Sequence, residues 1–223
     1  MLLKPTDKLY YGKYPYKIDF DLYGVSLLRV RGLDWAKEYC NDKNRLCSWV
    51  DEKRINRKEL KKFILALEPY ITKEDGFKTR TEGSRFSYYT ADLDEIKTLS
   101  KELKWCCSET WGPTTQQELD YLLSNRRKML CDALPYEQYR FKVFLRENTP
   151  VGVRTQFHTW KSNYTQDDIK VSGSTEYWLS GSKRYVQSPF FYIKDEKLLT
   201  FASLFLSSHV KTVYEYIPRH TVI

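Results

Sequence analysis

The chain has 223 residues, of which 41% are hydrophobic and 16% aromatic. This apolar content excludes a disordered protein, because a disordered chain lacks the hydrophobic surface that offsets the entropy lost on folding. Lys and Arg number 37 against 29 Asp and Glu, so the net charge is +8 and the electrostatic field favours a polyanionic partner. The sequence therefore predicts an ordered, basic protein with one large domain or two of roughly 100 residues.

The cysteines and the apolar segments bear on the compartment. Five cysteines, an odd number without a Cys-x-x-Cys pair, predict reduced thiols rather than disulfides or a structural zinc site. No apolar run approaches the roughly 20 residues that span a bilayer, and the amino terminus lacks the apolar core of a secretory signal. We expect an intracellular, cytoplasmic protein that contacts no membrane.

The two halves of the chain are similar to each other, which makes a search for repeats informative. Residues 9–20 align without a gap to residues 134–145, and Leu, two Tyr and Lys coincide. The same alignment then matches Arg29 with Arg154, Trp35 with Trp160, and Tyr39 with Tyr164. A one-residue gap further brings residues 86–88 onto residues 190–192. These matches predict a tandem duplication; the alternative is coincidence among Tyr-rich strands and amphipathic helices.

The first half, residues 1–113, has the pattern of strand, helix, strand, strand, helix, strand. These elements are predicted in turn at residues 14–22, 26–40, 46–50, 85–90 and 93–103, with a last strand that ends near Trp111. An extra basic helix at about residues 55–67 is inserted after the second strand.

Residues 114–133 connect the halves through a helix predicted from Thr115 to Cys131, which begins with the capping-box pattern Thr115-x-x-Glu118. The second half, residues 134–223, repeats the element order. Strands are predicted at residues 139–146 and 169–179, in a segment that ends at residues 190–194, and at residues 210–217. Helices are predicted at residues 150–163 and 195–206. The predicted fold class is therefore α+β. We expect a tandem duplication of a ferredoxin-like β-α-β-β-α-β unit with antiparallel sheets, whose helices cover one sheet face and leave the other for solvent or a partner.

Alternation assigns the side chains of the first strand of each half to two faces. The face toward the helices is apolar and aromatic, with Tyr14, Tyr16, Ile18, Phe20 and Leu22 in the first half and Tyr139, Phe141, Val143 and Leu145 in the second. Lys17 and Lys142 take equivalent places on the opposite face. Arg140, Phe144 and Arg146 accompany Lys142 there, so this face is predicted to be positive and partly aromatic.

A later strand of each half adds aromatic residues to this face. Phe86 and Tyr88 lie two apart in the first half, and Phe190, Tyr192 and Lys194 are expected to point outward in the second. Aromatic rings at this spacing on an exposed central strand can stack successive bases, as in the sheet of RNA-recognition motifs. The alternative is that these pairs pack under a loop or against the other half.

Two clusters of basic residues could contact phosphates. The inserted helix buries one apolar side and leaves Lys53, Arg54, Arg57, Lys58, Lys61 and Lys62 as a dense positive group. A shorter cluster of Arg126, Arg127 and Lys128 is placed on the connecting helix. Phosphate contacts of this kind give salt-sensitive binding that is indifferent to sequence. A solvated helix face paired with acidic neighbours such as Glu52 and Glu59 is the alternative.

Signals of catalysis are weaker. Asp19 and Asp21 lie two apart on a strand, a spacing that can direct both carboxylates at one Mg²⁺. Their counterparts in the second half are Phe144 and Arg146, which argues against a metal site. No phosphate-binding loop, dinucleotide fingerprint or His-Glu-x-x-His helix is present. We therefore assign no catalytic residue, no metal ligand and no cofactor.

The leading hypothesis is an intracellular protein that binds RNA or single-stranded DNA through basic and aromatic surfaces, a property suited to the replication of a virus or mobile element. The second hypothesis is a structural or scaffold protein whose exposed sheet faces bind another chain, including a second copy of itself. A metal-dependent nuclease is the third.

Overall fold

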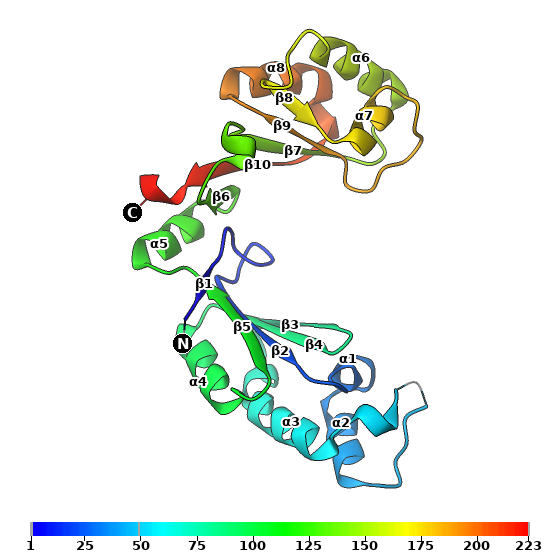
Figure 1. Cartoon of the computed structure of the whole chain (residues 1–223), viewed down its shortest axis with the longest axis vertical. Coiled ribbons are helices and arrows are strands. Elements are labelled where there is room, and N and C mark those ends of the chain that lie inside the picture. Colours follow the sequence, from blue (N-terminus) through cyan, green and yellow to red (C-terminus); the bar gives the residue numbers. More distant parts are fainter. Residues whose placement is uncertain (1, 49, 223) are drawn as a thin grey trace. The chain divides into compact units, whose positions relative to one another are not determined.

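Two five-stranded mixed sheets, one in each half of the chain, organise the fold (Figure 1). The computed structural model describes residues 2–48 and 50–222, and it divides into two units, Met1–Ser124 and Asn125–Ile223. The described residues contain eight α-helices, which confirms the predicted α+β class. None of the helices in the described ranges is long and apolar enough to cross a membrane.

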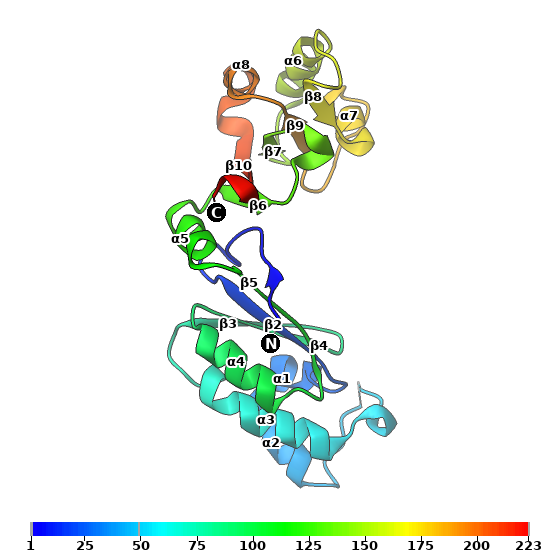
Figure 2. The same cartoon turned by 60° about the vertical axis from the view of Figure 1, so that its left-hand side comes forward.

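The described residues of the first unit form five strands and five α-helices. In chain order they are β1 (Lys4–Pro5), β2 (Tyr16–Asp21), α1 (Ser26–Arg31), α2 (Leu33–Asn41), α3 (Arg57–Ile71), β3 (Phe77–Glu82), β4 (Arg85–Thr90), α4 (Leu93–Glu102), β5 (Cys107–Gly112) and α5 (Gln116–Ser124), with a 3-10 turn η1 (Glu52–Arg54) before α3. The sheet order is β1-β5-β2-β4-β3. Strand β1 runs parallel to β5, and all other neighbours are antiparallel. Helices α1 to α4 lie on one face of this sheet (Figures 1 and 2).

The second unit repeats this strand arrangement. Its elements are β6 (Lys128–Cys131), β7 (Phe141–Leu145), α6 (Val151–Lys161), β8 (Ile169–Val171), α7 (Gly173–Leu179), β9 (Phe190–Ile193), α8 (Glu196–Leu206) and β10 (Val210–Pro218), with 3-10 turns η2 (Pro135–Glu137), η3 (Ser207–His209) and η4 (Arg219–Thr221). The sheet order is β6-β10-β7-β9-β8. Here β6 is parallel to β10 and the remaining neighbours are antiparallel. Helices α6, α7 and α8 lie on one face (Figure 1).

Alternation along the first long strand of each unit builds the cores. The predicted core residues of β2 and β7 are all buried, as are Leu60, Phe63, Ile64 and Leu67 on α3. In the first unit the ring of Phe63 meets Phe20 and Phe86 edge-on, at centroid distances of 5.3 and 5.5 Å. Such edge-to-face contacts add to the free energy of apolar burial. Each sheet is therefore fixed to its helices by the face that the sequence pattern predicts.

The helix predicted at residues 26–40 is broken into α1 and α2 at Gly32. This glycine has φ 85°, and its N–H donates to the Leu28 carbonyl. A positive φ after the last helical turn is the conformation in which glycine commonly ends a helix, because it has no Cβ to clash. Helix α1 therefore ends at Arg31, and α2 begins as a separate helix at Leu33.

The strand that takes the place of the predicted second strand of the first half is β3, not the segment 46–50. The described residues 46–48 and 50 form no strand, and Trp49 lies outside the described residues. Strand β3 has the sequence FKTRTE, whose alternate residues Lys78, Arg80 and Glu82 are charged and exposed. Only Phe77, Thr79 and Thr81 face inward, so the segment has few apolar residues. For this reason the sequence pattern did not predict a strand here.

Two further predictions of element type are wrong in part. The strand predicted at residues 169–179 ends at Val171, and α7 follows, because the Ser172 hydroxyl accepts a hydrogen bond from the Thr175 N–H at 3.4 Å and caps a helix. The connecting helix begins with the predicted cap, since the Thr115 hydroxyl accepts from the Glu118 N–H at 3.2 Å. It ends at Ser124, however, and Lys128–Cys131 pairs with β10 as strand β6.

Candidate functional site

The sheet face of the second unit opposite its helices is lined with aromatic rings and lysines. On β7, Lys142 and Phe144 alternate with buried residues. Across the strand pairs, Phe190 lies next to Phe144 and Tyr192 next to Lys142. We call this surface the aromatic face; it comprises Lys142, Phe144, Lys170, Phe190, Tyr192, Tyr214 and Tyr216.

The rings of the aromatic face form a continuous series. The centroids of Phe144 and Phe190 are 5.6 Å apart, and those of Phe190 and Tyr192 are also 5.6 Å apart. Tyr214 lies 6.0 Å from Phe144, and Tyr216 lies 6.5 Å from Tyr192. These distances fall within the range in which aromatic pairs attract each other. The rings thus support one another as a half-buried layer across β9, β7 and β10.

Lys142 lies in the middle of this layer. Its Nζ is 4.0 Å from the Phe190 ring centroid, 5.0 Å from Phe144 and 5.3 Å from Tyr192. A lysine ammonium at such distances is attracted by the negative faces of the rings. Burial raises the pKa of Tyr192, and the neighbouring Tyr136 adds to the shift. The phenol therefore stays neutral at physiological pH and does not repel an anionic ligand.

Cations continue the alternation of β7 and β9 beyond both ends of the aromatic face. Arg146 follows β7 and Lys194 follows β9, and both are exposed. The antiparallel pairing of Phe144 with Phe190 and of Phe141 with Ile193 puts Arg146 and Lys194 at opposite ends. The predicted outward residues Lys142, Phe144, Phe190 and Tyr192 thus share one surface. Arg146 and Lys194 are exposed just beyond its two ends.

The corresponding face of the first unit carries Tyr89 and Trp111 beside Lys17, together with ion pairs. Asp19 is 1% exposed; its Oδ2 lies 2.6 Å from the Lys17 Nζ, and its Oδ1 accepts a hydrogen bond from the Ser87 hydroxyl at 2.6 Å. The Asp21 carboxylate pairs with Arg85 at 3.3 Å. No group of three or more His, Cys, Asp or Glu in the described residues could hold a metal ion. Asp19 is thus an ion-pair partner of Lys17 in this arrangement.

The prediction that Phe86 and Tyr88 point outward is wrong. Phe86 is 2% exposed and Tyr88 is 0% exposed, because both face the helices. The Tyr88 hydroxyl donates to Glu95 Oε2 at 2.7 Å. The register explains the error: Lys17 pairs with Tyr89, as Lys142 pairs with Tyr192. The residue that corresponds to Tyr192 is therefore Tyr89, one position later than the sequence alignment had it.

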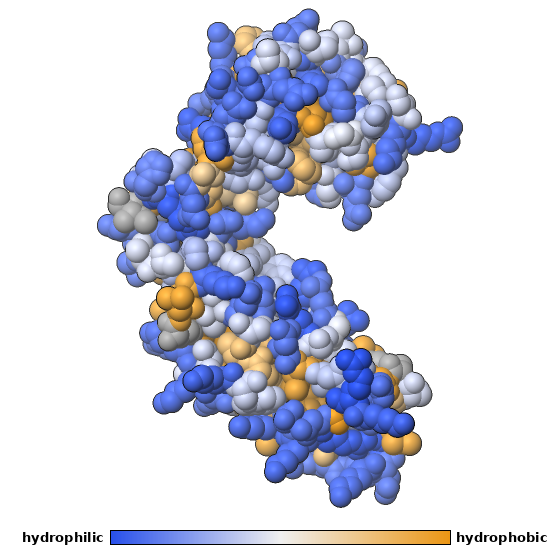
Figure 3. All heavy atoms as spheres, viewed as in Figure 1, coloured by the Kyte–Doolittle hydropathy of each residue, from blue (hydrophilic) through white to orange (hydrophobic). Residues whose placement is uncertain are grey.

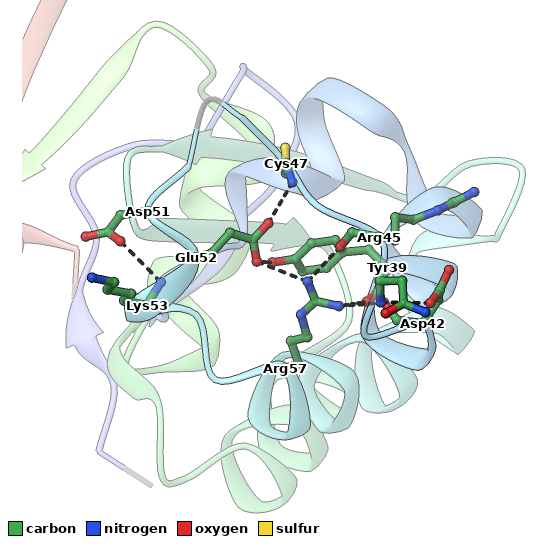
Figure 4. A network of polar contacts seen from close by, with 9 residues as sticks. Tyr39, Asp42, Arg45, Cys47, Asp51, Glu52, Lys53 and Arg57 are labelled. Carbon is green, nitrogen blue, oxygen red and sulfur yellow. Dashed lines mark hydrogen bonds and ion pairs between the residues drawn. The ribbon is translucent and has the colours of Figure 1, made fainter.

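Arg57 belongs to a loop-closing network rather than to the exposed basic cluster (Figure 4). Its guanidinium donates to the carbonyls of Tyr39, Asp42 and Arg45 at 2.9, 2.6 and 2.7 Å. It also pairs with Glu52 at 3.0 Å. These four acceptors engage the guanidinium inside the protein, so Arg57 holds the loop that joins α2 to α3.

The Glu52 carboxylate completes this network. Burial disfavours its charged form, but hydrogen bonds from the Tyr39 hydroxyl, the Arg57 guanidinium and the Cys47 N–H lower its pKa overall. Burial, together with the bond to Glu52, raises the pKa of Tyr39 to about 12. Sequence reasoning counted Arg57 as a free charge because the loop carbonyls that bind it carry no sequence signal.

The other basic residues near α3 are exposed. They are Lys53, Arg54, Lys58, Lys61 and Lys62. The Arg54 guanidinium lies 4.3 Å from the Tyr23 ring centroid, and the Lys62 Nζ lies 5.7 Å from that of Trp105. Hydrophilic side chains dominate the visible surface around α2 and α3 (Figure 3). Lys58, Lys61 and Lys62 together are called the α3 lysines below.

The predicted cluster at residues 126–128 is not helical. Arg126 and Arg127 are exposed in the turn before β6, and the Lys128 Nζ lies 3.6 Å from Glu215 Oε2. The same carboxylate pairs with Arg140. These cations are therefore divided between an exposed turn and an ion-pair group at the edge of the second sheet.

The sequence patterns did not predict a role for Tyr11, which precedes β2, or for Tyr136, which precedes β7. Tyr136 is 60% exposed, and its ring centroid lies 5.6 Å from that of Tyr192. The Lys170 Nζ lies 4.0 Å from the Tyr136 centroid. A signal was present, because the aligned segments match Tyr136 with Tyr11.

Comparison of the chain with protein-family models, with curated proteins and with solved structures found no match.

Proposed function

We propose that this protein binds RNA or single-stranded DNA, with the aromatic face of the second unit as its main contact surface. The observation that carries the proposal is the position of the Lys142 Nζ, which lies 4.0 to 5.3 Å from the centroids of three rings. These rings are on the sheet face opposite the helices. Unpaired bases stack on such rings, and the lysines attract phosphates. Duplex bases are stacked on each other and do not offer their faces.

The energetics favour a single-stranded ligand. A stacked base contributes about 1–3 kcal/mol in comparable sites, whatever its identity, because every base has a π-face. Phosphate contacts release counterions and make affinity fall with salt. The rings of the aromatic face can supply the base stacking, and the cations at its ends can supply the phosphate contacts. The first unit contributes through the α3 lysines and Arg54, which lie on another surface from its sheet face, where Asp19 and Asp21 are paired with Lys17 and Arg85.

We also infer that the units are tandem copies of a ferredoxin-like β-α-β-β-α-β unit, each extended by one parallel edge strand. The two sheets have the same strand order and pairing directions. Lys17 is flanked by Tyr89 and Trp111, and Lys142 by Tyr192 and Tyr214. Trp35 stacks on Tyr39 at 5.4 Å, and Trp160 packs on Tyr164 at 4.8 Å. These shared details support duplication beyond a likeness of strand order.

A protein-interaction module is the second candidate function. The observation that favours it is the aromatic face itself, because a layer of rings can also dock another chain, including a second copy. The two candidates differ in salt dependence. Association through rings is weakly affected by moderate salt, whereas binding to phosphates weakens steeply.

The test is fluorescence anisotropy of the full chain with labelled single-stranded RNA, single-stranded DNA and duplex DNA at two salt concentrations. We expect preference for single strands and a steep fall of affinity with salt. Replacing Phe190 and Tyr192 by Ala should reduce single-strand affinity, while Tyr177→Ala, which removes an exposed ring from α7, should not. If the parent chain binds no nucleic acid but sedimentation shows dimers that the Phe190 and Tyr192 changes disrupt, the interaction module is the better description.

A further inference from the structure

One exposed tyrosine in each unit lies in a tight turn with an unfavourable backbone. Tyr11 has φ 53° and the next residue, Gly12, has φ 67°; Tyr136 has φ 52° and Glu137 has φ 67°. In both turns the fourth residue donates its N–H to the carbonyl of the first, Lys13 to Tyr10 and Gln138 to Pro135. Positive φ at both central positions defines a type I′ turn, which favours Asn and Gly.

Tyrosine is a poor choice for this position. A bulky residue at positive φ is a genuine outlier, and such strain is found where function requires it. Nor is burial the reason for keeping the ring, because Tyr11 is 55% exposed and Tyr136 is 60% exposed. The turns are held by a different residue: the buried Tyr14 donates its hydroxyl to the Phe77 carbonyl at 2.9 Å, and the buried Tyr139 donates to the Gln166 carbonyl.

The surroundings of the two exposed rings are also alike. Tyr11 meets Tyr89 edge-on at 5.0 Å and 90°, and Tyr136 meets Tyr192 at 5.6 Å and 76°. A lysine of the neighbouring edge strand approaches each ring, with the Lys78 Nζ 5.8 Å from Tyr11 and the Lys170 Nζ 4.0 Å from Tyr136. We call the two groups tyrosine clamps; they are Tyr11, Tyr89 and Lys78 in the first unit, and Tyr136, Tyr192 and Lys170 in the second.

We propose that each tyrosine clamp is a binding site for one unpaired nucleobase, so that the chain carries two equivalent base sites, one in each unit. The exposed tyrosine stacks on the base, the strand tyrosine fixes the orientation of its ring, and the lysine contacts the adjoining phosphate. This inference rests on the proposed nucleic-acid binding and adds a second site to it, in the first unit.

Two sites on one chain change how affinity depends on ligand length. Trinucleotides occupy the clamps separately, and two bind per chain. A strand long enough to reach both clamps binds them together, because the second contact is intramolecular and its effective concentration is high. Affinity therefore increases with length by more than the added charge explains.

The key variants are Tyr11→Asn and Tyr136→Asn in the full chain. Asn is favoured in a type I′ turn, so each substitution relieves the backbone while removing the ring. The thermal midpoint should stay the same or rise. Calorimetric titration with oligothymidine or oligouridine of three nucleotides should show two sites in the parent and one in Tyr11→Asn. Tyr136→Asn should weaken the second-unit site on the order of 10-fold without abolishing it, because Phe144 and Phe190 of the aromatic face remain. The affinity for a 30-nucleotide strand should fall on the order of 10-fold for each substitution.

Tyr177→Ala is the control, because this tyrosine is 65% exposed on α7 and belongs to neither clamp. Photocrosslinking of bromouridine-containing strands, followed by mass spectrometry, should identify peptides with Tyr11 and Tyr136. If the Asn variants are folded and bind like the parent while the Phe190 and Tyr192 double variant is impaired, the clamp inference is wrong and the proposed function stands. If the parent binds no single strand, both are wrong. If the Asn variants lose stability, the rings serve folding, and the inference also fails.

Discussion

Lys17 and Lys142 occupy the same register position in their sheets but have different partners. Each is flanked by a tyrosine on one side and by a Trp or Tyr on the other. The Lys17 Nζ lies 2.6 Å from the Asp19 carboxylate, whereas the Lys142 Nζ lies 4.0 Å from the Phe190 ring centroid. The same lysine thus stabilises a buried carboxylate in one unit and an aromatic layer in the other.

This difference predicts that the same substitution affects mainly stability in one unit and mainly binding in the other. Lys17→Ala leaves the buried Asp19 carboxylate without its cation and should cost about 1–3 kcal/mol of unfolding free energy. Lys142→Ala should cost less stability but lower the affinity for single-stranded nucleic acid. Urea unfolding and anisotropy on both variants make the comparison. Equal loss of stability and unchanged binding in both would show that the two lysines have the same role.

Asp19→Asn keeps the shape of the residue and removes its charge. If Asp19 is an ion-pair partner and not a metal ligand, Mg²⁺ or Mn²⁺ should leave the thermal midpoint of the parent unchanged, and the substitution should alter stability alone. Incubation of labelled RNA and DNA with the parent and the variant checks this. Metal-dependent cleavage that disappears in Asp19→Asn, but not in an exposed control such as Asp94→Asn, would make the protein a nuclease.

Arg57→Ala should destabilise the first unit by about 2–3 kcal/mol, because it removes the guanidinium that donates to three carbonyls and to the Glu52 carboxylate. The adjacent Lys58→Ala removes the same charge from an exposed position and should change stability by no more than about 0.5 kcal/mol. Urea unfolding monitored by circular dichroism measures both. Similar values for the two variants would return Arg57 to the exposed basic cluster.

Acid should weaken the same network. The pKa of Glu52 is lowered in the folded protein, so its stabilising contribution is present above the unfolded value of about 4.3 and is lost as pH falls through the lower folded value. The free energy of unfolding should therefore decrease below about pH 4.3, and Glu52→Gln should make this decrease shallower. Glu59→Gln, at an exposed position of α3, is the control. An identical pH dependence in all three proteins would mean that Glu52 does not contribute.

Much of the fold follows from local patterns that the sequence displays. The alternation in β2 and β7, the capping Thr115 and the helical spacing in α3 each reflect one structural requirement, and each prediction is confirmed. Strand β3 was missed because half of its residues are charged edge positions. The position of Gly32 was readable, but helical spacing continued on both sides of it and outweighed a single glycine.

The candidate site was less predictable because it depends on register and on loops. Residues 86–90 of β4 are buried on both faces, so alternation could not tell which tyrosine faces the helices. The tertiary pairing of Lys17 with Tyr89 decides it. Likewise, the loop carbonyls that bind Arg57 come from residues far from it in sequence. The exposed tyrosines Tyr11 and Tyr136 were visible in the alignment, but only their backbone conformation distinguishes them.

The α3 lysines and the aromatic face should contribute to binding in separable ways. Replacing Lys58, Lys61 and Lys62 by Ala removes up to three phosphate contacts, which should weaken binding to single strands and duplexes alike and reduce the slope of log affinity against log salt by about 2 for single strands. Replacing Phe190 and Tyr192 by Ala should instead lower single-strand affinity by about 1–3 kcal/mol per lost stack and leave that slope nearly unchanged. The matched control replaces Lys97, Lys101 and Lys104, which are exposed on and just after α4, and therefore removes the same net charge from outside α3. Anisotropy titrations over a range of salt concentrations give both quantities once circular dichroism has verified folding. If the α3 and α4 triple variants change the slope equally, the α3 lysines act only through net charge, and the contact surface lies elsewhere.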